Sequence, residues 1–149
     1  MYKVRKFYEK IYNKEIKIHC CESTESEATK IFYNTYNAVK LQLFNEFYQF
    51  CGNKRINYHN VKDLLVKNKL VVNKNISVPG QDKKFSFSGD NLPHDINALN
   101  SMIKKSKLKN YIIEGTIKER NEMRAIDFQL ELDRTSEELA ILLSNNNDS

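Results

Sequence analysis

The sequence predicts an all-α fold, an up-and-down bundle of about five helices, and three observations favour it. Gly supplies only four and Pro only two of the 149 residues, so helix breakers are scarce. Apolar residues recur at steps of three and four along most of the chain, which is the helical period. Only residues 70–90 depart from that period, and we expect a small β-ribbon or an ordered loop excursion there.

The composition is that of one globular domain. Hydrophobic residues make up 40% and charged residues 29% of the chain, and 149 residues suffice to bury one core. We expect a single domain over residues 1–149, with an N-terminal helix and loop at 1–22 and a flexible tail at 144–149.

The first two helices carry the clearest apolar patterns. A helix over residues 2–17 is predicted from one stripe, formed by Val4, Phe7, Tyr8 and Ile11. A second helix is predicted to begin at a capping box of Thr24 and Glu27 and to stop at Gly52 and Asn53. Its apolar side chains are predicted to face the core: Ala28, Phe32, Tyr36, Val39, Leu43, Phe47 and Phe50.

Later segments predict shorter helices. A third helix is capped by Asn57 or Asn60, and a fourth begins near Asn91 with Pro93 in its first turn. Apolar spacing resumes at Ile112 and continues beyond residue 140, which fits either one long helix or two joined near residue 134.

Bulk charge and cysteine usage restrict the function classes. The net charge is +5 with a pI near 9.0, a field that attracts polyanions but also suits an ordinary lysine-rich surface. No apolar run is long enough to cross a membrane and no signal-type segment is present, so a cytoplasmic protein without membrane association is expected. The spacing of Cys20, Cys21 and Cys51 matches no zinc motif, and neither a metal nor a cofactor is expected.

Three residues of the predicted late helix are the candidate site. Arg120 and Arg124 are four residues apart and project from one side of a helix, with Asn121 adjacent. Two guanidinium groups at one place could clamp a phosphate, because each offers a planar fork of donors. The alternative is a surface of salt bridges with neighbouring carboxylates, namely Glu119, Glu122, Asp127 and Glu131.

This motif resembles the RNA-cleaving Arg-Asn signature of the HEPN superfamily, in particular the HEPN-like nucleases of the MAE type. Three short pieces carry the resemblance: residues 31–34 with Glu46, residues 87–91, and residues 117–123. The family's motif histidine is missing, because its place is taken by Ala125, Ile126 and Asp127. His19, His59 and His94 lie elsewhere and are interpreted as ordinary surface or packing residues.

The resemblance implies a HEPN-like domain that binds RNA or cleaves it without a metal, in a toxin-antitoxin or phage-defence system. Arg120 and Asn121 would then be catalytic and Arg124 a phosphate contact, while the missing base leaves activity uncertain. The alternative is a catalytically inactive binding or regulatory subunit acting through protein contacts. A homodimer through the late helices is expected, with RNA, an antitoxin or another protein as candidate partners.

Overall fold

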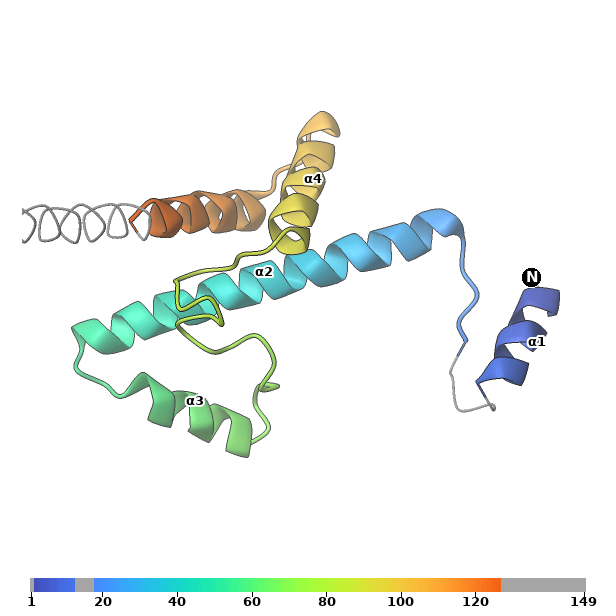
Figure 1. Cartoon of the computed structure of the whole chain (residues 1–149). Helices are drawn as coiled ribbons and strands as arrows, with labels where there is room; N and C mark the ends of the chain where they lie inside the picture. Colours follow the sequence, from blue (N-terminus) through green and yellow to red (C-terminus); the bar gives the residue numbers. More distant parts are fainter. Residues whose placement is uncertain (1, 13–17, 127–149) are drawn as a thin grey trace, which may run out of the picture.

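The longest helix, α2 (Ser23–Asn53), lies at the centre of the structure (Figure 1). The computed structural model describes residues 2–12 and 18–126. At the start of α2 the backbone N–H of Glu22 donates to the carboxylate of Glu25 over 2.9 Å. The capping box is therefore two residues earlier than predicted, with a carboxylate at the cap in place of the Thr24 hydroxyl. The predicted stop at Gly52 and Asn53 is confirmed.

Helix α3 (Tyr58–Lys67) packs on the C-terminal half of α2. The side chain of Asn57 caps it by accepting from the backbone N–H of Asn60 at 3.2 Å. One of the two predicted caps is thereby confirmed. The Tyr58 hydroxyl donates to the carbonyl of Ile76 over 2.7 Å, which ties the following loop to α3, and burial raises the pKa of Tyr58 to about 12.

Helix α4 (Asn91–Lys105) crosses α2, and a further helix occupies residues 111–126, called the late helix below (Figure 1). Pro93 lies in the first turn of α4, as predicted. The described residues thus confirm the all-α prediction of about five helices. The choice between one helix and two near residue 134, and the predicted tail at 144–149, lie outside the described residues.

The segment between α3 and α4 is an ordered loop. Over residues 68–90 it contains no strand, so the loop alternative holds and the β-ribbon does not form. Apolar side chains of this loop complete the core in two places. Ile76 and Val78 join Phe44 of α2 in one cluster, and Phe87 packs with Ala38 and Ile96 in the other.

The predicted core face of α2 is wrong. Five of its seven residues are exposed by 42–61%: Phe32, Tyr36, Leu43, Phe47 and Phe50. The side that packs against the rest of the chain is instead rich in polar residues, which are Thr35, Asn37, Gln42 and Asn45, together with Ala38, Phe44 and Cys51. Periodicity identified an apolar face but could not tell what would cover it.

Helix α1 (Tyr2–Ile11) packs against no other helix of the described residues. Its apolar stripe is exposed by 47–61% at Val4, Phe7, Tyr8 and Ile11. The helix was predicted to extend to residue 17, but residues 13–17 lie outside the described structure. α1 is therefore an amphipathic helix with no partner within the described chain.

Candidate functional site

The side chains of Arg120 and Arg124 lie against the loop that precedes α4. Arg120 Nε donates to the carbonyl of Phe87 over 3.1 Å, and its guanidinium carbon is 5.2 Å from the centre of the Phe87 ring. Burial, together with repulsion from Arg124, lowers the pKa of Arg120. Asn121 is exposed, and its side-chain oxygen accepts from Arg120 Nη1 at 3.0 Å.

Arg124 holds the same loop one turn further along. Its Nη1 donates to the Asp82 carboxylate over 2.8 Å, and Nη2 donates to the carbonyl of Ser86 over 3.2 Å. Burial acts to raise the pKa of Asp82, but hydrogen bonds from Arg124 and Ser88 outweigh it and the pKa is lowered. Arg124 thus forms its ion pair with Asp82 of the loop. The carboxylates expected as its partners were those of the late helix.

A carboxyl pair lies beside this arginine pair. Burial raises the pKa of Glu119 on the late helix, and a hydrogen bond with Glu46 of α2 raises it further. A carboxyl group that keeps its proton can donate to a neighbouring carboxylate. Glu46, one of the residues that carried the family resemblance, thus contacts the late helix through Glu119.

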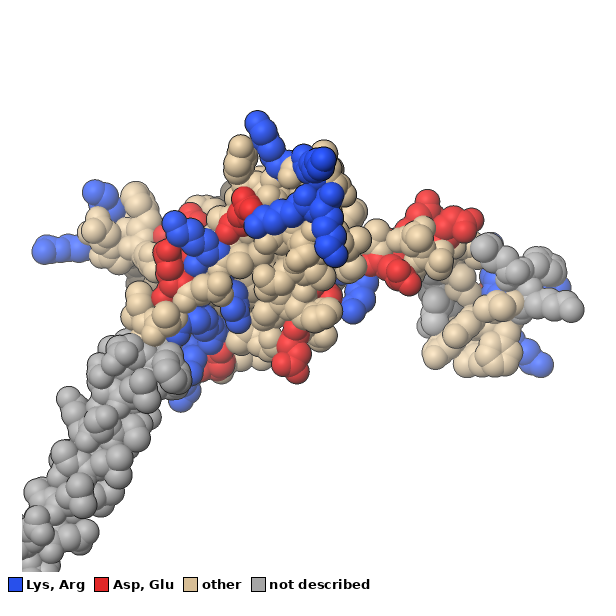
Figure 2. All heavy atoms as spheres, turned by 90° about the horizontal axis from the view of Figure 1, so that it is seen from above, with Lys and Arg blue, Asp and Glu red and all other residues tan. Residues whose placement is uncertain are grey.

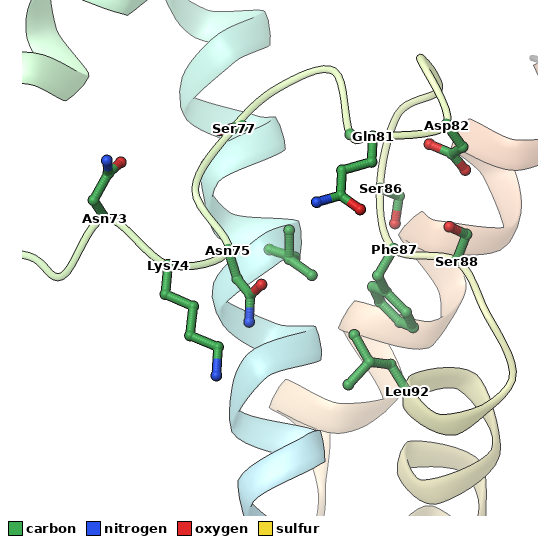
Figure 3. Close-up of a pocket in the computed structure, with 12 residues that line it drawn as sticks. Asn73, Lys74, Asn75, Ser77, Gln81, Asp82, Ser86, Phe87, Ser88 and Leu92 are labelled. Carbon is green, nitrogen blue, oxygen red and sulfur yellow. The ribbon is translucent and has the colours of Figure 1, made fainter.

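The arginine-bound loop forms one wall of a cavity of 510 Å³ (Figure 3). Asp82, Ser86 and Phe87, the three loop residues that the arginines hold, all line it. Its remaining walls carry mostly amide and hydroxyl groups, with an apolar floor: Asn73, Lys74, Asn75, Ser77, Gln81, Ser88, Leu41, Gly80 and Leu92. In Figure 3 the Phe87 ring and the Leu92 side chain lie next to each other below Gln81.

Amide side chains of α2 fix the path of this loop. Asn37 accepts from the side chain of Asn75 at 3.0 Å, and Asn45 accepts from the backbone N–H of Ser86 at 2.9 Å. Gln42 accepts from the Ser86 hydroxyl. Ser86 has φ of 62°, a left-handed conformation that a non-Gly residue adopts only when its surroundings enforce it.

The opposite side of α2 carries an apolar surface, which we call the outer face: Phe32, Tyr36, Val39, Leu43, Phe47 and Phe50. Two hollows open beside it. One, of 260 Å³, lies between α2 and α3 and has no polar lining atoms; Phe47, Phe50, Ile56, Val61 and Leu65 line it. The other, of 380 Å³, lies next to Tyr36, Leu43, Leu70 and Val72.

Two of the three histidines have identified surroundings. His94 Nδ1 lies 3.1 Å from the carboxylate of Asp95, while the His94 side chain itself is largely exposed. The Asp95 carboxylate is buried and accepts from Asn34 of α2 at 2.6 Å, so it fastens α4 to α2. His59 packs its ring against Tyr58. None of these contacts brings a histidine to Arg120.

Figure 2 shows Lys and Arg at several separate places on one face, with Asp and Glu between them. Near the end of α4, Lys104 forms an ion pair with Glu114 at 2.7 Å. Among the described residues, no helix has the length and apolar content required to span a bilayer.

Residues 24–123 match the family model described as the UDP-glucose/GDP-mannose dehydrogenase family, central domain. The chain belongs to this family. The match covers α2, α3, α4 and most of the late helix. No curated protein and no solved structure matches the chain.

The family match corrects the resemblance drawn from short motifs. The HEPN assignment is wrong, and with it the endoribonuclease of a toxin-antitoxin or phage-defence system. The alternative of an inactive binding or regulatory subunit gains no specific support from the match. Each of the three motif pieces is short, whereas the family match extends continuously over residues 24–123. The catalytic and phosphate-binding roles of Arg120, Asn121 and Arg124 stay predictions.

Proposed function

We propose that this chain is a dimer-forming helical core of the nucleotide-sugar dehydrogenase type, in which α2 pairs with α2 of a second copy. The observation that carries the proposal is the outer face, where five large apolar side chains are exposed by 42–61%. Monomeric proteins seldom expose a larger apolar patch than this, and such patches mark interaction surfaces.

The size of the outer face suits a dimer. A large aromatic side chain buries about 150–250 Å² when fully covered, so each half-exposed one offers on the order of 100 Å². The outer face and the rims of the two hollows together then supply roughly 800 Å² per partner, which is the area of a standard stable interface. The hollow rims contribute Ile56, Val61, Leu70 and Val72.

An antiparallel arrangement fits the order of these side chains. Reversing α2 about a two-fold axis near residue 41 superposes the outer face on itself, with Phe32 opposite Phe50 and Tyr36 opposite Phe47. Such an interface is isologous, the usual form for homodimers. The dimer we propose is therefore made through α2 and not through the late helices.

The sequence favours a role in joining two copies over a role in the hydride transfer of a dehydrogenase. Its four glycines stand far apart, so these 149 residues contain no glycine-rich dinucleotide fingerprint. The function proposed for the described chain is to join two copies and to present the polar cavity.

Sedimentation equilibrium tests this proposal directly. Wild-type protein is expected at twice the chain mass of 17.5 kDa, and Phe47→Glu at the chain mass, because an unpaired buried charge costs several kcal/mol. Gln49→Glu adds the same charge on α2 about 160° away from Phe47 in projection and is expected to remain dimeric. A monomeric wild type, or a Phe47→Glu variant that still dimerises, contradicts the proposal.

The polar cavity supports a second function, which is the binding of a sugar nucleotide such as the UDP-glucose or GDP-mannose in the family's description. Amide and hydroxyl groups line it, and these bond to sugar hydroxyls, while Lys74 on its rim carries the charge that a phosphate requires. Arg120 and Arg124 would act as positioning residues, since each holds a wall residue by its backbone carbonyl.

Thermal denaturation with UDP-glucose or GDP-mannose tests this second function. Either ligand at a hundred times its Kd is expected to add about 2.7 kcal/mol to the free energy of unfolding. Gln81→Leu, in the cavity wall, should abolish the shift, and Lys69→Met, outside it, should not. An unshifted melting temperature at millimolar ligand rules the site out.

A further inference from the structure

The turn between α4 and the late helix carries a dense group of lysines. We call residues 102–112 the basic tip, and its lysines lie within six positions of one another: Lys104, Lys105, Lys107 and Lys109. All four are exposed. Between residues 96 and 118 the only acidic residue is Glu114, which forms an ion pair with Lys104 at 2.7 Å. The basic tip therefore concentrates positive charge at one end of α4.

Large apolar side chains are exposed around the same turn. Four of them are exposed by 56–73%: Met102, Leu108, Tyr111 and Ile112. Lys109 Nζ lies 6.0 Å from the centre of the Tyr111 ring, so a cation and an amphipathic ring are neighbours. The basic tip thus presents lysines and apolar side chains together on one exposed turn.

The position of the basic tip leaves it accessible. α4 is fastened to α2 near its own first turn, where Asp95 binds Asn34 and Ile96 packs with Ala38. Lys105 ends the helix about 15 Å further along, at 1.5 Å per residue. In Figure 1 this end of α4 points away from α2. The contact of α4 is made on the side of α2 opposite the outer face, so pairing through the outer face would leave the tip open.

The combination of charge and apolar surface favours an anionic lipid surface over other polyanions. Lysines near a membrane are attracted to anionic headgroups, aliphatic side chains enter the boundary with the acyl chains, and Tyr lies at the level of the headgroups. A nucleic acid or an acidic polypeptide would neutralise the lysines, but neither needs aliphatic side chains such as Leu108 and Ile112 between them.

We propose that the basic tip binds the surface of membranes that contain anionic phospholipids. Its lysines contact the headgroup phosphates, while Leu108 and Ile112 enter the acyl boundary. A surface contact of this kind needs no spanning helix, which agrees with the helices of the described residues. The expectation of no membrane association rested on the length of apolar runs and did not concern such a contact. The inference does not rest on the proposed function.

Co-sedimentation with lipid vesicles tests the contribution of charge. The wild-type protein is expected to bind vesicles of phosphatidylcholine and phosphatidylserine, to ignore vesicles of phosphatidylcholine alone, and to bind more weakly as salt is added. Lys105→Gln combined with Lys109→Gln should lower the partition coefficient about 10-fold or more. Lys54→Gln combined with Lys67→Gln removes the same charge from exposed positions elsewhere and should lower it by less than about 3-fold.

The same assay with Leu108→Ser tests the contribution of the apolar side chains. This substitution keeps every lysine, and we expect it to lower the partition coefficient about 5-fold or more. Ile126→Ser, at a position exposed by 62% at the other end of the late helix, is the matched control and should leave binding unchanged.

Three results would overturn the inference. The first is a wild-type protein that does not bind anionic vesicles at low salt. The second is binding that Leu108→Ser leaves unchanged, because the contact would then be one of charge alone. The third is binding to soluble polyglutamate but not to vesicles, which would assign the basic tip to an acidic polypeptide.

Discussion

The two sides of α2 differ in a way that separates the fold from the function. The inner side is polar and buried, and its amides each bind a specific atom of the loop over residues 75–86. The outer face is apolar, and five of its six residues are exposed by 42–61% in the described chain. Directional bonds fix where a loop runs, whereas apolar area is stabilised by any complementary surface. The inner side therefore specifies the monomer, and the outer face is left for a partner.

Substitution of Ser86, the loop residue bound by the inner side of α2, should cause the largest loss of stability. Ser86→Val places a β-branched residue at φ of 62° and leaves Gln42 without its donor. We expect a loss of about 3 kcal/mol in the free energy of unfolding from strain and the lost hydrogen bond. Urea denaturation measures it. Ser77→Val, at an exposed position of the same loop, should change stability by less than about 0.5 kcal/mol.

The contact between α4 and α2 should depend on pH. Hydrogen bonds from Asn34 and His94 lower the pKa of Asp95 below its value in the unfolded chain. A carboxylate of this kind contributes stability above the unfolded pKa of about 3.9, and the contribution is lost as pH falls through the lower folded value.

The Asp95→Asn variant should consequently lose less stability than wild type between about pH 4.5 and pH 2.5. Urea midpoints across this range provide the comparison, and Asp63→Asn, at an exposed position of α3, should retain the wild-type slope. Equal slopes for wild type and Asp95→Asn would show that the buried carboxylate does not control this contact.

Substitution on the outer face should have the smallest effect on the monomer. Phe32→Ser removes a side chain that is 58% exposed, so the free energy of unfolding measured on dilute monomer should change by about 0.5 kcal/mol or less. The dimer dissociation constant should rise about 10-fold or more. A large loss of monomer stability instead would mean that Phe32 belongs to the core of its own chain.

Local signals in the sequence correctly predicted several helix boundaries. The stop at Gly52, the cap at Asn57 and the start of α4 near Asn91 depend only on nearby residues, and all are observed. The orientation of α2 depends on distant contacts instead. The loop partners of its amides at 37, 42 and 45 lie 38–44 residues away in the chain, so no local pattern could indicate them.

The candidate site shows the same limit. The four-residue spacing of Arg120 and Arg124 predicted that both would project from one side of a helix, and both do contact one loop. The sequence could not show that the two guanidinium groups would donate to backbone carbonyls of a loop 33 and 38 residues earlier in the chain. A short motif gives residue types and spacing, but the partners of its side chains come from tertiary structure.

The most direct test of the central claim is a cross-link across the outer face. Chains with Phe32→Cys and chains with Phe50→Cys, both in the Cys20→Ser and Cys21→Ser background, are mixed and oxidised. The proposed antiparallel pairing predicts a covalent heterodimer in the mixture and little product from Phe32→Cys alone. Covalent dimers from Phe32→Cys alone, or none in the mixture, would contradict the pairing of α2 with itself in this arrangement.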